Sequence, residues 1–458
     1  MIDYTPKEHG WAMVTINNDT AEIAFLASHL HDSRQDLIRS VATFKNILLS
    51  SKDIITLVTN FLSLYFTTLV VKSLKNNTSK PKTHMKRLQT LLSLFCALVS
   101  LHTFAQSAPS NSLIMYVGTY TEGGNSKGIY TYSFDQQQGT SVLLGSTTAA
   151  NPSFIALAPN GKHLYAVSEY NDGRQRVYSF EIGQDKLPSQ PVFQPTQASA
   201  DPCHIIADSK YAITANYTGG DISVFLLNAA GKLQAEIQYI AFEGRTPERV
   251  AHIHCMIPTP DGKYVLATDL GNDRIYRFRY NQEAPQGAEV FTDQQIAYQV
   301  SDGQGPRHLT FSKDGRFAYL INELGGECVV LSYHKGKMKE VQRLMADEGQ
   351  GGGSADIHIS PDGRFLYTSH RLKKDGISIF AIDPKRGTLK KVGYQLTGIH
   401  PRNFAITPNG KYLLVACRDD NKIQVFQRNE TTGTLTDTSQ HISVDKPTCI
   451  IFTEIINH

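Results

Sequence analysis

Apolar and polar residues alternate along most of the chain in a pattern that recurs. An apolar run is followed by a polar turn centred on Asn-Gly or Asp-Gly, and then by a second run rich in Tyr, Leu and Val. This alternation predicts two half-buried strands joined as a hairpin. Five copies are evident: FIALAPNGKHLYAVSE at Phe154–Glu169, HCMIPTPDGKYVLATD at His254–Asp269, HLTFSKDGRFAYLINE at His308–Glu323, IHISPDGRFLYTSHR at Ile357–Arg371 and FAITPNGKYLLVACR at Phe404–Arg418.

The turn glycines give the length of the repeat. From Gly262 onward they are separated by 53, 48 and 47 residues, and the 101 residues between Gly161 and Gly262 leave room for another copy. The segment CHIIADSKYAITANY at Cys203–Tyr217 fills that gap, with Ser209 near the place of the glycine. A repeat of this length in an all-β sequence predicts a radial array of sheets, a β-propeller.

Further strand patterns complete each unit. The runs GDISVFLL at Gly220–Leu227, DGISIFAI at Asp375–Ile382 and GTLKKVGYQL at Gly387–Leu396 bring each unit to four strands. At the two ends, PTCIIFT at Pro447–Thr453 resembles an inner strand without a hairpin, whereas Leu113–Phe134 supplies strands without an inner partner. Pairing them would close the ring and cover two exposed sheet edges.

The sequence therefore predicts an all-β protein, a seven-bladed β-propeller over residues 113–458 with four-stranded antiparallel blades. The ring is expected to close by pairing of its amino-terminal and carboxy-terminal strands. One blade cannot bury both of its faces alone, so stacking between neighbouring blades must supply the core.

A targeting pattern precedes the predicted propeller. Met85–Ala105 combines two basic residues, an apolar stretch and a small-residue cleavage site, which is typical of a secretory signal peptide, and residues 106–112 would form a short linker. We expect translation to start at Met85, with residues 1–84 an upstream extension and the mature protein periplasmic or secreted. The alternative is a membrane-anchored protein, in which the uncharged stretch Ile54–Val71 forms a marginal transmembrane helix.

Composition narrows the classes of partner. A formal net charge of +3 and 19% charged residues describe an ordinary soluble surface without a basic stripe for nucleic acid. The five cysteines outside the signal are spread over different blades, so we expect small buried hydrophobes rather than disulfides. A monomer with no stable membrane association after signal removal is the expected state.

Ionisable residues recur at a fixed distance from the turn glycines. Positions equally far before and after a hairpin turn meet at the same end of the two strands, and inner strands line the channel of a propeller. The ionisable residues eight positions before or after a glycine are His254, Arg307, Arg402, Glu169, Glu323, Arg371 and Arg418. His308 and His358 lie slightly deeper on the same strands, and the glycine-rich run at 349–356 places Asp356 at the channel. We expect these residues to converge at one mouth of the channel.

Histidines, arginines and a glutamate in one funnel suit hydrolysis of an anionic substrate. A neutral imidazole or a carboxylate can activate water as a general base, and arginines can hold a carboxylate or phosphate and stabilise an oxyanion. The alternative is that Arg–Glu pairs merely tie blades together, which we favour for Arg418 and Glu169. No HExxH, paired CxxC or GxSxG motif is present, so no cofactor or metal is expected.

At these same residues the sequence resembles the bacterial 6-phosphogluconolactonases of the seven-bladed propeller type and the broader lactonase family around them. The stretches that carry the resemblance are GPRHLTFSKDGRFAYLINEL, ADIHISPDGRFLYTSHR and HPRNFAITPNGKYLLVA, with weaker matches at HCMIPTPDGKYV and MYVGTYT. The resemblance runs from Leu113 to the carboxy terminus and covers none of the first 84 residues.

The resemblance implies opening of the δ-lactone of a sugar acid by water, with no metal needed. The cleft residues of the family map onto His254, Arg307, His308, Glu323, His358, Arg371 and Arg402. On this basis Glu323 or His358 would activate water, while Arg307 and Arg402 would hold the lactone carbonyl or a phosphate. His254 and His308 would orient the ring. We place Asp356 and Arg371 among the substrate-binding residues.

Four alternatives stay open. An export signal fits poorly with a cytosolic phosphorylated lactone, so the substrate could be 6-phosphogluconolactone or an unphosphorylated aldonolactone. The fold also hosts a cyclase that forms a lactone from a carboxymuconate, and propellers serve as non-enzymatic binding platforms. A metal-dependent propeller lactonase would have to use the set Glu323, Asn322, Asn216 and Asp356.

Overall fold

The computed structural model describes residues 112–196, 199–285 and 287–454, together with three strands near the amino terminus. The chain divides into two compact units, residues 1–106 and 107–458. In the first unit, an antiparallel sheet has the strand order β1 (Ile2–Lys7), β2 (Trp11–Asn18) and β3 (Ala21–Ser28).

The predicted targeting segments fall outside this description. Neither the signal peptide at Met85–Ala105 nor the apolar stretch Ile54–Val71 lies among the described residues. Within the part of the chain that the structure does describe, no helix is long and apolar enough to cross a membrane.

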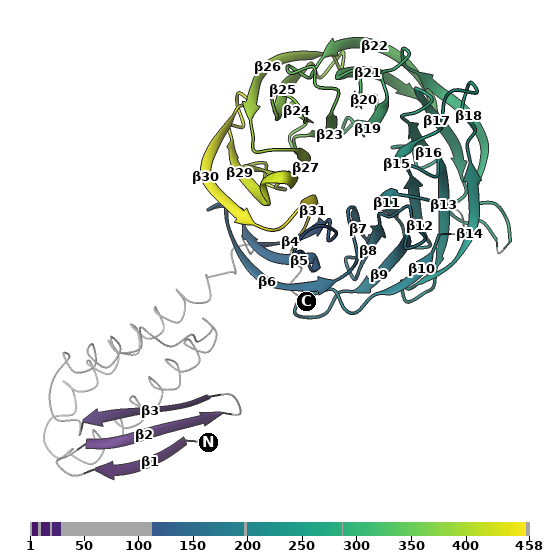
Figure 1. Ribbon diagram of the computed structural model, residues 1–458. Coiled ribbons are helices and arrows are strands. Elements are labelled where there is room, and N and C mark those ends of the chain that lie inside the picture. Colours follow the sequence, from purple (N-terminus) through teal and green to yellow (C-terminus); the bar gives the residue numbers. More distant parts are fainter. Residues whose placement is uncertain are drawn as a thin grey trace, which may run out of the picture. The chain divides into compact units, whose positions relative to one another are not determined.

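The second unit is a ring of seven four-stranded antiparallel sheets, the blades, arranged around an axis (Figure 1). Within each blade the strands are named from the innermost outward. Blades 1 to 3 contain β7 (Ile155–Leu157), β8 (His163–Ser168), β9 (Arg176–Glu181) and β10 (Val192–Pro195); β11 (Pro202–Ala207), β12 (Tyr211–Asn216), β13 (Asp221–Leu227) and β14 (Leu233–Ala241); and β15 (Ile253–Pro258), β16 (Tyr264–Asp269), β17 (Arg274–Tyr280) and β18 (Phe291–Gln299). Blades 4 to 6 contain β19 (Pro306–Phe311), β20 (Phe317–Asn322), β21 (Glu327–His334) and β22 (Lys337–Met345); β23 (Ser354–Ile359), β24 (Phe365–His370), β25 (Gly376–Ile382) and β26 (Leu389–Leu396); and β27 (Pro401–Ile406), β28 (Tyr412–Cys417), β29 (Lys422–Arg428) and β30 (Leu435–Ser443), with a 3-10 turn, η3 (Arg418–Asp420), after β28.

Blade 7 joins the two ends of the ring. Its inner strand is β31 (Pro447–Glu454), which pairs with β4 (Ser112–Thr119), followed by β5 (Gly128–Asp135) and β6 (Thr140–Thr148). Ile450 lies opposite Val117 in this antiparallel pair. The predicted all-β, seven-bladed propeller and its closure by the terminal strands are confirmed.

The core is built between blades. Each apolar cluster combines strands of two neighbouring blades; for example, Leu414 and Val425 of blade 6 pack in one cluster with Met115 and Val117 of blade 7, all of them at most 1% exposed. Successive residues of a strand point to opposite faces of the blade, and both faces pack against neighbouring blades. Charged and polar residues therefore lie mainly in the turns, on the outer strands and at the axis.

The repeated glycines have the backbone conformation that their positions require. Gly161, Gly262, Gly315, Gly363 and Gly410 have φ between +66° and +75°, a region that glycine adopts without steric cost. In blade 2, which lacks the glycine, the Asp208 amide bonds to the Tyr211 carbonyl across a shorter turn. Ser209 and Lys210 are not among the residues with positive φ.

The loops that lead into the inner strands share a second feature. In five blades the inner strand or the segment before it begins with a proline, and the preceding residue has a left-handed backbone. These residues are Asn151, Asp201, Gly305, His400 and Lys446, with φ between +42° and +66°. A left-handed non-glycine residue before proline is an uncommon conformation that the surrounding structure must hold in place. The mouth of the channel is therefore formed by conformationally restricted turns.

The cysteines agree with the prediction from their spacing. Cys203, Cys255, Cys328, Cys417 and Cys449 are all buried and free. Burial raises the pKa of each of these thiols, so they remain protonated and act as small apolar residues.

Candidate functional site

A bulge recurs at the start of the inner strands. In β19 the residue pairs are Pro306 with Asn322 and His308 with Ile321, which leaves Arg307 as an extra residue. The same irregularity leaves His254 extra in β15 and Arg402 extra in β27. A bulge changes the direction of the extra side chain. It therefore explains how consecutive residues such as Arg307 and His308 can both serve the channel, which strict alternation forbids.

Glu323 lies between two of the predicted arginines. It follows β20 directly, and its Oε2 lies 2.7 Å from Nε of Arg307, while its Oε1 lies 3.0 Å from Nη2 of Arg371. The side chains of Arg307 and Arg371 are only 2% and 6% exposed. Burial by itself would raise the pKa of Glu323, but the charges of Arg307, Arg371 and Arg402 outweigh it and hold the pKa below its usual value. Glu323 is therefore a carboxylate anion.

Backbone carbonyls of the glycine-rich segment, residues 349–356, accept further hydrogen bonds from Arg307 and Arg371. Arg371 Nε donates to the Gly353 carbonyl at 2.8 Å, and Arg307 Nη1 donates to the Ala355 carbonyl at 2.6 Å. The segment packs so closely that a Cβ on Gly353 would lie 2.7 Å from Leu372 Cγ. Asp347 accepts hydrogen bonds from the amides of Gly349 and Gly351. This segment is a fixed support for the two guanidinium groups.

A second ion pair joins blade 6 to blade 1. Arg402 Nη2 lies 3.4 Å from Oε2 of Glu169, and Tyr120 donates its hydroxyl to Oε1 of the same carboxylate at 2.6 Å. The Arg402 guanidinium also lies 5.3 Å from the centre of the Tyr120 ring. Glu169 thus links blade 1 to blade 6, which agrees with the expectation that it pairs with an arginine between blades. This pair lies within the charged centre.

Asp356 connects the histidines. Its Oδ1 lies 2.8 Å from Nδ1 of His308 and its Oδ2 lies 2.8 Å from Nε2 of His358, while Asn403 Nδ2 donates to Oδ2 at 2.5 Å. Burial would raise the pKa of Asp356, but His358 and His308 hold it well below the usual value. Because a carboxylate only accepts, the hydrogen-bond network assigns a proton to the facing nitrogen of each ring. Nε2 of His308 and Nδ1 of His358 are then the nitrogens that remain as acceptors.

The two histidines differ in their surroundings. Burial and the charge of Arg307 lower the pKa of His308 to about 4, against the opposing effect of Asp356. Burial would lower the pKa of His358 as well, but there Asp356 prevails and raises it above 6.5. The side chain of His358 is 43% exposed, whereas that of His308 is 8% exposed. His358 therefore combines access to water with a pKa that Asp356 raises.

Two further histidines pack beside His308. The ring centroids of His254 and His204 lie 5.1 Å and 5.6 Å from that of His308. Burial, reinforced by neighbouring positive charge, holds the pKa of both rings well below 6.5, so they are neutral. Nδ1 of His254 is buried with no hydrogen-bond partner among the described residues. An unpaired buried nitrogen of this kind is an unfilled hydrogen-bonding position.

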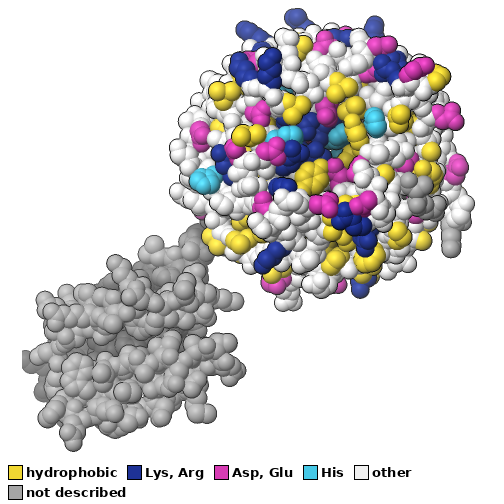
Figure 2. Space-filling view, in the orientation of Figure 1, with side chains coloured by type: hydrophobic (Ala, Val, Ile, Leu, Met, Phe, Trp, Pro, Cys, Tyr) yellow, Lys and Arg dark blue, Asp and Glu magenta, His cyan; other side chains and the backbone are white. Residues whose placement is uncertain are grey.

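The structure thus gathers all eight predicted site residues into one connected region. Basic side chains (Lys or Arg, dark blue) and histidines (cyan) are visible over the centre of the ring (Figure 2). Arg307 links the two halves of this region, since its Nη1 lies 3.4 Å from Nε2 of His308. Arg418 lies at the edge, where its Nη2 is 3.2 Å from Nδ1 of His400, and His400 in turn lies 3.3 Å from Arg371.

Four contributors were absent from the sequence prediction: Tyr120, His204, His400 and Asn403. Asn403 lies seven positions before Gly410, the place that His308 and Asp356 occupy in their blades, so the same count would have found it. His204 was hidden because its blade has no turn glycine from which to count. Tyr120 follows β4 as Glu323 follows β20, but its inner partner strand comes from the other end of the chain.

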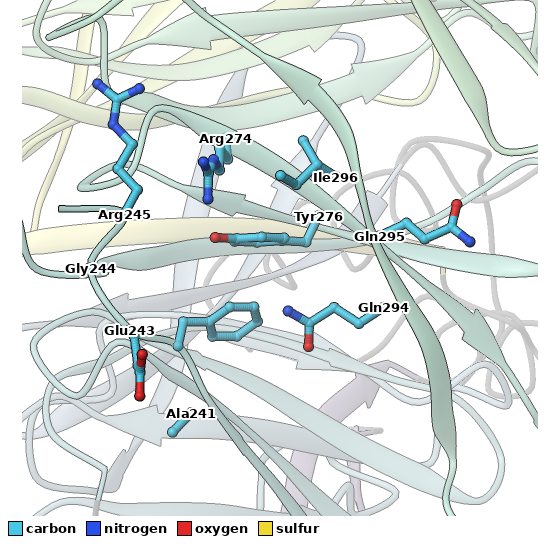
Figure 3. A pocket seen from close by; sticks show the side chains of 10 residues that line it. Ala241, Glu243, Gly244, Arg245, Arg274, Tyr276, Gln294, Gln295 and Ile296 are labelled. Carbon is cyan, nitrogen blue, oxygen red and sulfur yellow. The ribbon is translucent and has the colours of Figure 1, made fainter.

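A separate pocket lies away from this centre. It has a volume of about 440 Å³ and opens between the outer strands of blades 2 and 3, where Phe242 is among the lining residues. Tyr276, Arg274 and Gln294 also line it (Figure 3). Arg245 at its edge pairs with Asp302 at 2.5 Å. Among the described residues, no group of three His, Cys, Asp or Glu side chains is arranged to hold a metal ion.

Fold and site together define a class: a seven-bladed propeller whose channel mouth holds buried, mutually oriented arginines, carboxylates and histidines. The family model for the seven-bladed β-propeller lactonases matches residues 114–452. The chain belongs to this lactonase family. The predicted resemblance is therefore confirmed.

Individual relatives agree with that assignment. A 6-phosphogluconolactonase of Formosa agariphila is 34% identical over 343 residues, which cover 72% of this chain and 97% of the relative. A 6-phosphogluconolactonase of Bacillus subtilis is 32% identical over 74% of this chain and 98% of its own length. Among solved structures, the periplasmic gluconolactonase of Pseudomonas aeruginosa is 31% identical with a TM-score of 0.68, covering 74% of this chain and 99% of that one.

Proposed function

We propose that the chain hydrolyses the δ-lactone of a sugar acid at the mouth of its channel. The observation that carries the proposal is the placement of Glu323 between Arg307 and Arg371, next to two histidines that share Asp356. Such a centre offers fixed positive charge for a carbonyl oxygen and an oriented base for water. The names of the relatives, 6-phosphogluconolactonase and gluconolactonase, support the same reaction.

His358 is the base in this proposal. Its Nδ1 removes a proton from water while its Nε2–H remains hydrogen-bonded to the Asp356 carboxylate, and the water oxygen forms a bond to the lactone carbonyl carbon. The carbonyl electron pair moves to oxygen, where Arg307 and Arg402 stabilise the negative charge. When this pair returns, the bond to the ring oxygen breaks, and that oxygen takes the proton from His358. The product is the open hydroxy acid.

Glu323 has a different role in the proposal. A good general base has a pKa near the working pH, and the arginines hold the pKa of Glu323 below its usual value. We therefore assign Glu323 to positioning of Arg307 and Arg371, and His308 and His254 to orientation of the lactone ring as neutral hydrogen-bonding groups.

Charge favours an unphosphorylated lactone. Arg307, Arg371 and Arg402 face the two carboxylates Glu323 and Glu169, each of which already occupies one or two of the guanidinium groups. A phosphate dianion needs more uncompensated positive charge than this arrangement leaves. The signal peptide predicted at Met85–Ala105 is consistent with an aldonolactone met outside the cytosol, and we propose an exported monomer.

The test compares freshly generated 6-phosphogluconolactone and glucono-1,5-lactone as substrates of the full-length chain in the presence of a chelator. Spontaneous opening sets the background, and Arg307→Ala and His358→Gln proteins are measured beside the parent. Excess hydrolysis that both substitutions abolish is the expected result. No excess rate on either lactone would overturn the proposal and leave the cyclase and binding alternatives, and loss of activity in chelator would point to a metal-dependent lactonase.

A further inference from the structure

A second polar pocket lies at the same mouth of the channel. It has a volume of about 330 Å³, and we call it the Tyr120 pocket after one of its residues. Its lining comes from the loop after β4, the loop before β7, the turn η3 and the residue before β31: Tyr120, Glu122, Asn151, Arg418, Asp419 and Lys446. The pocket therefore lies where blades 6, 7 and 1 meet.

The Tyr120 pocket shares its walls with the charged centre. On one side, Tyr120 bonds to Glu169, which pairs with Arg402. On the other side, Arg418 contacts His400, which contacts Arg371. One side chain thus lies between the pocket and each of two arginines of the centre, so the two regions are adjacent.

The charged side chains of the pocket already have hydrogen-bond partners. Arg418 donates to both oxygens of Asp419, at 2.6 Å and 3.0 Å, Lys446 Nζ donates to the backbone carbonyl of Glu122 at 2.9 Å, and the Glu122 carboxylate lies 2.9 Å from Nη2 of Arg174. Two cations and two carboxylates line it, so no net positive charge is left for a phosphate. Instead the pocket presents donors and acceptors side by side, which is what a neutral polyhydroxyl ligand requires.

The wall nearest the centre is fixed in position. Asn151 Oδ1 accepts hydrogen bonds from the amides of Thr121 and Glu122, at 2.8 Å and 3.1 Å, and its Nδ2 donates to the Glu169 carbonyl at 3.1 Å. A cavity with fixed polar walls beside a reaction centre orients whatever part of the substrate enters it.

We propose that the Tyr120 pocket binds a second, uncharged sugar unit, so that the preferred substrate is the δ-lactone of a glycosylated aldonic acid. This inference rests on the proposed lactonase function. It adds that the lactone ring lies at the arginines while the sugar attached to it occupies the pocket, where Lys446 and the carboxylate of Glu122 hydrogen-bond its hydroxyl groups.

The experiment measures kcat/KM of the full-length chain on cellobiono-1,5-lactone, glucono-1,5-lactone and 6-phosphogluconolactone. The disaccharide lactone is expected to be the best substrate. Lys446→Met and Glu122→Gln are each expected to lower its kcat/KM by roughly tenfold, the value of one hydrogen bond involving a charged group, and to leave glucono-1,5-lactone unchanged. Lys127→Met, an exposed lysine of the same loop, is the matched control and should change neither.

Each other outcome has a definite meaning. Equal or poorer hydrolysis of the disaccharide lactone, with no response to the pocket substitutions, would overturn the inference while the lactonase function stands. A selective loss of 6-phosphogluconolactone hydrolysis in Lys446→Met would overturn it in favour of a phosphate site. Absence of hydrolysis of all three lactones would overturn the proposed function, and the inference with it.

Discussion

Glu323 and Arg307 form an ion pair within a single blade, with 2.7 Å between Oε2 and Nε, and the second oxygen of Glu323 reaches Arg371 in the next blade. One carboxylate therefore fixes two buried guanidinium groups that come from separate repeats. The arrangement is sensitive to loss of the carboxylate, because both buried arginines would lose the acidic side chain with which they pair.

Replacement of Glu323 by Gln should affect both activity and stability. We expect kcat/KM to fall by about 10²-fold or more, as when a preorganised charge-stabilising group is disturbed, and the free energy of unfolding to fall by about 3 kcal/mol because a buried pair is broken. Lactone hydrolysis and urea denaturation measure the two effects. Glu327→Gln, on the next strand of the same blade and paired at 3.6 Å with Arg343, is the control. Full activity in Glu323→Gln would contradict the positioning role.

The pH dependence of hydrolysis should reveal the influence of Asp356 on His358. Since the neutral ring acts as base, kcat/KM should fall as the pH drops through the His358 pKa, which Asp356 raises above 6.5. In Asp356→Asn that effect is lost and burial dominates, so the acid limb should move to lower pH while the plateau falls about 10²-fold or more. A pH–rate profile with an unshifted acid limb would exclude His358 as the base.

Acid should destabilise the fold through a histidine outside the proposed chemistry. His370 is fully buried between the hydroxyls of Ser354 and Thr368, and burial lowers its pKa to about 3. Below pH 6.5 the unfolded chain therefore binds a proton that the folded chain does not, and stability decreases as the pH falls from 6.5 toward 3. Urea midpoints at about pH 7.5 and about pH 5 should differ, and less so in His370→Gln. The raised pKa of His358 acts in the opposite direction and offsets part of the loss.

Ring closure should depend on the packing of β31. Ile450 is 3% exposed in the cluster that joins blades 6 and 7, and Ile450→Ala should lower the free energy of unfolding by about 3 kcal/mol through lost burial and a cavity. Ile399→Ala, at a side chain 58% exposed, is the control and should have little effect. Equal thermal stability of the two variants would mean that closure contributes little.

The glycine-rich segment gives a test of the backbone support. Gly353→Ala would place a Cβ 2.7 Å from Leu372 Cγ and 3.0 Å from the backbone carbonyl oxygen of Arg371. The crowding would displace the carbonyl of residue 353, which accepts the hydrogen bond from Arg371 Nε. We expect a loss of kcat/KM of roughly tenfold or more. Gly363→Ala is the contrast: no described atom lies within 4 Å of its Cβ, but its φ of +73° makes the substitution cost stability. Activity per folded molecule should then fall only in Gly353→Ala.

The fold could be predicted from the sequence because glycine recurs for one physical reason, the positive φ of the hairpin turn. Gly315 and Gly363 mark turns with positive φ, and from them the blades, their number and the end of the hairpin at which ionisable residues gather all follow. Glu323 and Arg371 could be found by counting because each directly follows the second strand of its blade.

What the sequence could not supply is direction and pairing. The bulge that makes Arg307 an extra residue has no distinctive residue type, so neighbouring positions could not be assigned to faces. Nor could counting show that Glu323 serves two arginines, that Asp356 serves two histidines, or that Tyr120 joins them from the far end of the chain. Such contacts depend on the angle between blades, which no local pattern encodes.

The pairing of β31 with β4 has a consequence for how the protein is made. About 330 residues separate Ile450 from Val117, so six blades can form on a nascent chain before the seventh is complete. Until the last strand leaves the ribosome, β4 presents a bare edge of unpaired amides and carbonyls, and its closure is a long-range and therefore slow contact. The protein is therefore most exposed to edge-to-edge aggregation in the interval between synthesis of β4 and synthesis of β31.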